Sequence, residues 1–217
     1  MYDMYFSELD EALLKKLDYS GGCLVKKFSS YTYYESEKKK IKNKNILLGA
    51  LIKTTSKKEI RKFSQEFRRA DILYAFHCSD EVSRTAFEEG LVDIVIPLLS
   101  GRKNFMKQLN SGFDTAMARF GANNNVCLGF SFKDFSEDTM VSALMKQNAR
   151  LCKKYKTPFL ILSGAETKYE YISPGILSAF GELIGFDKKQ SKEALTITPS
   201  NFWNRKNCVM PGVKVID

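Results

Sequence analysis

The sequence predicts an α/β fold with a parallel sheet, open or closed into a barrel, and three observations favour it. Short apolar runs recur along the 217 residues, and a longer segment with helical spacing follows each run. The runs are apolar throughout, as in Ile46–Leu48 and Phe159–Leu162, which is typical of parallel strands covered on both faces. The segments between the runs are long enough for crossover helices.

Each predicted strand is one of these runs, about five to eight residues long. In order, the predicted strands are Tyr2–Phe6, Gly22–Lys26, Ile46–Lys53, Asp71–Phe76, Val92–Pro97, Val126–Phe132 and Phe159–Ser163. The predicted helices are Glu8–Leu17, Lys57–Arg68, Glu81–Glu89, Gly112–Ala122, Glu137–Tyr155 and Pro174–Ile184. Tyr31–Asn45, which contains Lys38-Lys39-Lys40, is interpreted as a loop or a helix edge.

Residues 112–132 join a helix rich in alanine and glycine to a buried strand. Small side chains on the inner face of a helix allow it to approach a sheet closely. The asparagines at 123–125 tolerate the left-handed conformation that ends helices. We therefore expect this stretch to have a packing role.

Capping residues support the other helix boundaries. Ser56 and Glu59 have capping-box spacing before the third helix. Ser136 is expected to open the longest helix, with acidic residues at its positive end. Ser173 and Pro174 suit the cap and first turn of the helix after the seventh strand.

Length and charge limit the classes of function. A chain of 217 residues fits one domain spanning residues 1–217. Its 34 lysines and arginines against 25 acidic residues give a net charge of +9. Such an excess favours a polyanionic partner, either nucleic acid or an acidic membrane surface. Solubility alone explains a bare charge excess equally well.

The five cysteines are spread along the chain without a Cys-x-x-Cys pair. This pattern is typical of reduced thiols in the cytoplasm, and it does not suggest a disulfide framework or a zinc site. Cys23, Cys127 and Cys152 lie in apolar surroundings and are predicted core residues. No signal peptide and no apolar run of membrane-spanning length is found, so we expect a cytoplasmic protein that does not enter a membrane.

Residues that could form an active site are sparse. The single histidine, His77, follows the fourth predicted strand, and Asp3, Asp80 and Glu166 are the carboxylates that could approach it. One histidine with scattered carboxylates is a poor metal site, so His77 is interpreted as a hydrogen-bonded loop residue. Ser163 lacks the Gly-x-Ser-x-Gly elbow of a nucleophile. Phosphate-binding glycine loops are also missing from the sequence.

Basic residues gather at predicted strand ends and helix starts instead. They are Lys53, Arg84, Arg102, Lys103, Lys133 and Lys168. With the aromatic residues Tyr31, Tyr33, Tyr34, Phe132 and Tyr169, these cations could form a surface that contacts phosphates and stacks on bases. The alternative interpretation is an exposed face with weak ion pairs.

The order of several short motifs resembles one family. The motifs are Leu17-Asp18-Tyr19-Ser20-Gly21, Leu48-Gly49, Ser83-Arg84-Thr85-Ala86 with Val92-Asp93-Ile94-Val95, Gly112-Phe113-Asp114 with Asn124-Asn125-Val126, Ser163-Gly164-Ala165 with Ser173-Pro174, and Pro211-Gly212-Val213-Lys214-Val215. Together they span nearly the whole chain. In this order the chain resembles ribonuclease P protein component 3, the barrel subunit shared by archaeal and eukaryotic ribonuclease P.

The resemblance implies a fold and a function. The fold is a TIM-like (β/α) barrel of the polymerase and histidinol phosphatase type, with seven or eight parallel strands and without metal ligands. The function is that of a non-catalytic subunit that binds ribonuclease P RNA together with protein component 2, as a two-plus-two assembly. The holoenzyme, with its other protein subunits, removes the 5′ leader from precursor tRNA. No cofactor is expected on this chain, and magnesium would belong to the RNA.

On this interpretation eight basic residues are the predicted RNA contacts: Arg84, Arg102, Lys103, Lys133 and Lys168, with Lys38, Lys39 and Lys40 as peripheral ones. Two positions depart from the family pattern, because Ser83 stands where asparagine is common and Ile172 where a basic residue is common. The loop after Pro97 departs as well.

The alternative function is a metal-dependent phosphoesterase on the same barrel that uses His77, Asp3, Asp80 and Glu166.

Overall fold

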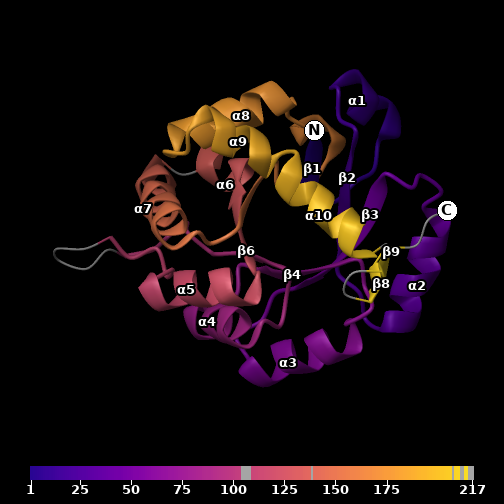
Figure 1. Cartoon of the computed structure of the whole chain (residues 1–217), viewed down its shortest axis with the longest axis horizontal. Coiled ribbons are helices and arrows are strands. Elements are labelled where there is room, and N and C mark those ends of the chain that lie inside the picture. Colours follow the sequence, from indigo (N-terminus) through magenta and orange to yellow (C-terminus); the bar gives the residue numbers. More distant parts are fainter. Residues whose placement is uncertain (104–108, 138, 207, 211–212, 215–217) are drawn as a thin grey trace.

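The computed structural model describes residues 1–103, 109–137, 139–206, 208–210 and 213–214 (Figure 1). The strands are β1 Tyr2–Phe6, β2 Gly21–Lys26, β3 Ile46–Ile52, β4 Ile72–Phe76, β5 Ile94–Ile96, β6 Cys127–Ser131, β7 Phe159–Leu162, β8 Cys208–Met210 and β9 Val213–Lys214. The helices are α1 Glu11–Lys16, α2 Tyr31–Lys40, α3 Lys57–Glu66, α4 Asp80–Glu89, α5 Thr115–Asn124, α6 Phe132–Glu137, α7 Thr139–Tyr155, the 3₁₀ helix η1 Lys168–Glu170, α8 Pro174–Leu183, α9 Lys188–Ala194 and α10 Ile197–Lys206.

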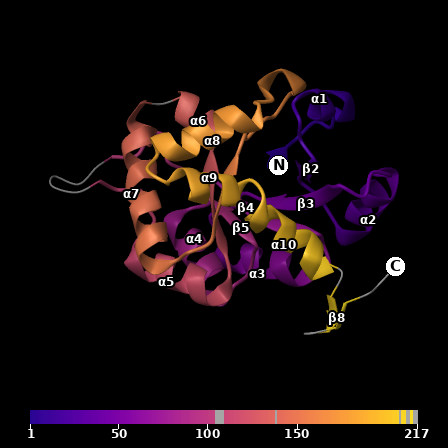
Figure 2. The same cartoon turned by 45° about the horizontal axis from the view of Figure 1, so that its top comes forward.

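Strands β1 to β7 form one parallel sheet in sequence order. The sheet curls until β1 lies beside β7, where Phe6 and Ala165 form an isolated parallel bridge. The main helices surround the strands (Figures 1 and 2). The prediction of a parallel α/β barrel is therefore confirmed, and the barrel is nearly closed.

Side chains complete the seam between β1 and β7. Oδ1 of the fully buried Asp3 accepts hydrogen bonds from the Ser163 N–H at 3.1 Å and from the Tyr5 N–H at 3.2 Å. The Ser163 hydroxyl donates to the Tyr5 carbonyl at 2.9 Å. Burial raises the pKa of Asp3 to about 6, and the hydrogen bonds oppose that rise. The carboxyl of Asp3 thus replaces part of a missing strand ladder.

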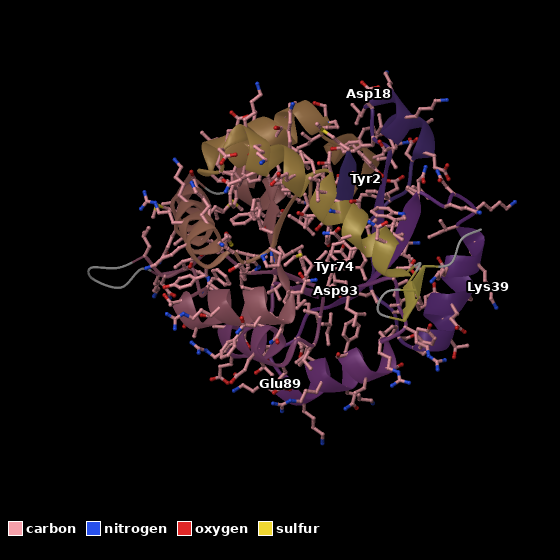
Figure 3. The ribbon with its side chains drawn as sticks, in the orientation of Figure 1. Tyr2, Asp18, Lys39, Tyr74, Glu89 and Asp93 are labelled. Carbon is pink, nitrogen blue, oxygen red and sulfur yellow. The ribbon has the colours of Figure 1, made fainter. Side chains whose placement is uncertain are left out.

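Alternate side chains of the strands point into the barrel and fill it. Tyr74 is the largest fully buried interior side chain, and its hydroxyl donates to the Met4 carbonyl (Figure 3). Gly49 makes room for it, because a Cβ at that position would lie 2.5 Å from the Tyr74 ring. The outward side chains pack under the helices in a second apolar cluster. The interior is therefore a packed core and not a pore.

Helix α10 covers the amino end of the barrel, where Figure 1 shows it crossing in front of the strands. Phe202 and Trp203 pack against the interior cluster, and the Trp203 ring lies 4.7 Å from that of Tyr2. The Trp203 indole N–H donates to the Lys44 carbonyl at 3.3 Å. Helices α9 and α10 were not predicted from the sequence.

The small-residue helix behaves as expected. Gly121 packs so closely that a Cβ would lie 2.7 Å from Cγ2 of Thr157. Asn125 ends α5 in the left-handed conformation, with φ of +54°. The helix begins at Thr115 rather than at Gly112, because the Asp114 side chain caps it by accepting from the Met117 N–H at 2.9 Å.

The interpretation of residues 31–45 as a loop or helix edge was wrong over its first part, which is the regular helix α2. Ser30 caps this helix, because its hydroxyl accepts from the Tyr33 N–H at 3.3 Å. Tyr34 is its one buried residue, and the Tyr34 hydroxyl donates to the Leu48 carbonyl at 2.9 Å. A single buried anchor leaves no apolar periodicity for the sequence to reveal.

Ser136 does not open the longest helix, which is a second correction. The chain turns helical directly after β6, and Ser136 lies inside α6, where its hydroxyl donates to the Lys133 carbonyl at 2.8 Å. The long helix α7 begins at Thr139. At the C-terminus, β9 pairs with β8 in an antiparallel ladder, so Val213 and Lys214 are not an eighth barrel strand.

Candidate nucleic-acid interface

The carboxyl ends of parallel strands meet at one end of a barrel, where barrel proteins carry their binding sites. A cavity of about 550 Å³ opens there beside the ends of β1 to β4. We call this cavity the barrel mouth. Its lining residues are Tyr5, Ser7, Val25, Lys26, Lys27, Leu51, Lys53, Phe76 and Glu166. Three lysines against one carboxylate make its lining cationic.

Aromatic rings lie at the barrel mouth. The Phe76 ring stacks on Tyr5 with 5.6 Å between centroids and on His77 with 3.8 Å. His77 Nε2 lies 3.2 Å from a carboxylate oxygen of Asp134. Burial raises the pKa of Tyr5 to about 12, so its hydroxyl stays neutral at physiological pH. The interpretation of His77 as a hydrogen-bonded loop residue is confirmed.

Arg84 and Arg102, two predicted RNA contacts, each pair with a carboxylate at the start of a helix. Arg84 pairs with Asp114 beside α5, and Arg102 makes a two-pronged pair with Asp80 at the start of α4. Arg102 thereby lowers the pKa of Asp80. The Arg102 side chain is 12% exposed and that of Arg84 is 47% exposed. Arg84 is therefore the more accessible of the two, and Lys103 is exposed as well.

Lys133 and Lys168 lie near the end of β7, on the side of the mouth that carries Glu166. Lys133 Nζ lies 2.9 Å from Glu166 and 3.2 Å from Glu170. Burial would lower the pKa of Lys133, but these two carboxylates raise it. Lys168 is exposed, and its ammonium lies 5.3 Å from the ring centroid of Tyr169. Tyr169 is 87% exposed, so this lysine and ring form an accessible cation–aromatic pair.

Lys38, Lys39 and Lys40 lie in the last turn of α2, toward the opposite end of the barrel. Lys38 Nζ lies 2.5 Å from Asp71, which directly precedes β4, and Lys40 pairs with Glu37. Lys39 extends outward at the edge of the molecule (Figure 3). The structure therefore does not bring the eight predicted contacts together on one surface.

The aromatic residues predicted to stack on bases also differ in accessibility. Tyr34 is fully buried and Phe132 packs against Phe135 and Phe180, so neither offers a free ring face. Tyr33 is 51% exposed, and together with Tyr169 it is accessible to a base.

Sequence reasoning missed two groups of cations. Lys26 and Lys27 lie at the barrel mouth. Their position could have been predicted, because they end an apolar run in the sequence just as Lys53 does. The second group borders two cavities of about 610 and 490 Å³ at the amino end of the barrel. Its members are Lys42, Lys44, Arg68 and Arg69, and they lie beside the predicted contact Lys38.

The four residues of the alternative metal site do not form a cluster. Asp3 closes the seam, His77 contacts Asp134, and two carboxylates hold cations of this chain, Asp80 with Arg102 and Glu166 with Lys133. Across the part of the chain that the structure describes, no group of three or more histidine, cysteine or acidic side chains is arranged to hold a metal ion. The phosphoesterase alternative is therefore not favoured.

Burial of the cysteines agrees with the sequence analysis, which places Cys23, Cys127 and Cys152 in the core. Cys23, Cys78, Cys127 and Cys152 are buried, whereas the Cys208 side chain lies outside the described residues. Among the described helices none combines the length and apolar character needed to cross a bilayer.

Comparison with known proteins gives matches along the whole chain. A family model described as RNase P subunit p30 matches residues 10–207. A ribonuclease P protein component 3 from Methanocaldococcus jannaschii is 30% identical over 226 residues, covering 96% of this chain and 94% of the relative. One from Methanothermobacter thermautotrophicus is 25% identical over 222 residues, covering 93% and 86%.

A solved structure is similar over the same length. It is a chain of the cryo-EM structure of archaeal ribonuclease P with mature tRNA. The two chains superpose with a TM-score of 0.80 and 26% sequence identity, covering 100% of this chain and 98% of that chain.

Proposed function

The chain belongs to the RNase P subunit p30 family, and from this premise we propose that it binds the RNA of ribonuclease P and does not itself cleave RNA. The observation that carries the proposal is the full-length similarity to a chain of archaeal ribonuclease P. The net charge of +9 and the cationic barrel mouth suit a polyanionic partner. In this role the chain supports removal of the 5′ leader from precursor tRNA by the holoenzyme.

The isolated chain is proposed to be inactive. Asp80 and Glu166, which a metallohydrolase would need as free ligands, instead neutralise Arg102 and Lys133. Magnesium then acts in the active site of the RNA subunit. A carboxylate that holds an arginine or lysine is a weaker metal ligand.

The proposed assembly contains protein component 2 in a two-plus-two complex, the other ribonuclease P proteins, and precursor tRNA through the complex. It is supported by the resemblance of the whole chain to its family. The proposed location is the cytoplasm, which agrees with cysteines that are spread along the sequence without a Cys-x-x-Cys pair.

Reconstitution tests the proposal. Ribonuclease P RNA is combined with component 2, with and without this chain, and the rate of precursor-tRNA cleavage is measured at fixed magnesium concentration. We expect this chain to raise the rate and to lower the magnesium concentration needed, because cations of a protein subunit screen phosphate repulsion as the RNA folds. An unchanged rate and magnesium requirement would contradict the proposal.

A control assay covers the isolated chain. It is incubated with precursor tRNA and with a generic phosphodiester in the presence of magnesium or manganese. No turnover is expected. Metal-dependent turnover that disappears in the His77→Ala variant would contradict the proposed inactivity and restore the phosphoesterase function.

A further inference from the structure

The barrel mouth combines exposed cations with a partly apolar lining. Lys27 and Lys53 are both exposed, and neither forms an ion pair with any residue in the described part of the chain. The other charges there are already engaged. Lys26 lies 3.4 Å from Glu37, and Glu166 lies 2.9 Å from Lys133. The mouth therefore presents two uncompensated positive charges.

The walls of the mouth suit a flat apolar group. Val25 and Leu51 point into the barrel from neighbouring strands, beside the partly exposed ring of Phe76. Ser7 lines the same cavity. A volume of about 550 Å³ falls within the ordinary range for small-molecule sites. A ligand that matches this lining has an anionic part and a flat, largely apolar part.

We propose that the barrel mouth binds a single unstacked nucleotide of RNA, with its phosphate on Lys27 and Lys53 and its base against Leu51 and Phe76. Proteins recognise single-stranded RNA in this way, by pairing cations with phosphates and apolar or aromatic side chains with splayed-out bases. This inference rests on the proposed function, since it states where on this chain the RNA is bound.

The positive charge of the mouth disfavours a divalent cation, which is the other ligand that a barrel of this shape could bind. Two uncompensated lysines repel a divalent cation, and Glu166 is held by Lys133. The same lysines attract a phosphate. A free mononucleotide has the same chemistry as a nucleotide within RNA, so the experiment must distinguish these two sources.

The single histidine of the chain reports on the site directly. Because the His77 ring stacks on Phe76 at 3.8 Å, a ligand at the mouth alters the magnetic environment of its carbon-bound protons. We suggest NMR titration of the full chain, labelled at histidine with ¹³C. The three probes are inorganic phosphate, adenosine monophosphate and a single-stranded hexa-adenylate.

The expected result is a saturable shift of the His77 signals with hexa-adenylate, a weaker saturable shift with adenosine monophosphate, and a smaller response to phosphate. A response to phosphate equal to that of the nucleotides would indicate an anion site and overturn the proposal. A response to the mononucleotide with none to hexa-adenylate would indicate a free-nucleotide site, which also overturns it. No response to any probe would overturn it too.

Lysine variants give the second measurement. Lys27→Ala with Lys53→Ala should weaken hexa-adenylate binding by about tenfold and reduce the slope of log affinity against log salt by about 0.7, because both lysines hold one phosphate and each phosphate neutralised on a single strand contributes about 0.7. Lys27→Arg with Lys53→Arg should retain binding. The matched control is Lys15→Ala with Lys16→Ala, two exposed lysines at the end of α1. Equal losses in the control would show general electrostatics and overturn the site.

Reconstitution separates this site from the function on which it rests. If the natural chain raises precursor-tRNA cleavage and the Lys27→Ala, Lys53→Ala variant raises it equally, the mouth site fails and the proposed function stands. If the natural chain has no effect, the proposed function fails whatever the mouth binds in isolation.

Discussion

The two ends of the barrel are built differently. At the amino end, α10 lies across the strands and the Trp203 ring packs against that of Tyr2. At the carboxyl end the strands run into lysines around a cavity. At the covered end α10 extends the apolar interior and the cations border the cavities beside it, whereas at the mouth lysines surround the strand ends themselves. Substitutions at the amino end should therefore change stability, and substitutions at the mouth should change binding.

Phe202→Ala should produce the largest effect on stability. Phe202 is 9% exposed and packs against the interior cluster. Removing a buried aromatic ring costs about 3 kcal/mol of unfolding free energy. Urea unfolding followed by circular dichroism measures it. The salt dependence of RNA binding should stay unchanged, and a changed slope would show that the amino end also binds RNA.

Asp3→Asn tests the seam between β1 and β7. Burial raises the pKa of Asp3 from 3.8 to about 6. Between about pH 4 and 6 the folded chain therefore holds a proton that the unfolded chain releases, so this group's stabilisation is complete below pH 4 and is lost as the pH rises through 6. The loss amounts to roughly 2–3 kcal/mol.

The Asn variant should lose this pH dependence, which unfolding measured from pH 4 to 7 would reveal. Asp18→Asn is the matched control, since Asp18 is exposed and lies at the edge of the molecule (Figure 3). An identical pH slope in the Asp3 variant and the natural chain would contradict the assignment.

Replacing Arg84 and Arg102 together by alanine tests the predicted contacts outside the mouth. If both contact phosphates of duplex RNA, the slope of log affinity against log salt should fall by about 1.8, at about 0.9 per contact on a duplex. Filter binding to ribonuclease P RNA between 50 and about 200 mM salt measures it. An unchanged slope would mean that these arginines serve only their pairs with Asp114 and Asp80.

Lys39→Ala should have the smallest effect. The side chain is exposed on α2, and among the described residues it forms no ion pair. Loss of one peripheral charge should weaken RNA binding by about twofold and leave the melting temperature unchanged. A loss of RNA affinity as large as that from replacing the mouth lysines would indicate that the main interface lies toward the amino end.

The strands were predictable from the sequence because their apolar runs are continuous. Ile46–Ile52 is an example, because both of its faces are buried. Helix α2 was not predictable, since Tyr34 alone anchors it. Charge predicts the RNA contacts, together with a position near strand ends or helix starts for Arg84, Arg102, Lys103, Lys133 and Lys168, and sequence position does not reveal ion pairing. Arg102 and Asp80 are 22 residues apart, so their pairing appears only in the fold.

The seam has a consequence for synthesis on the ribosome. Asp3 emerges well before its hydrogen-bond donor at Ser163, because the two residues are separated by 160 positions. Strands β1 to β7 are all translated before that partner exists, and the inward apolar side chains of β1 to β6 have no closed core until β7 is made. Until β7 has been translated, the nascent chain of this protein therefore depends on chaperones to protect those strands from aggregation.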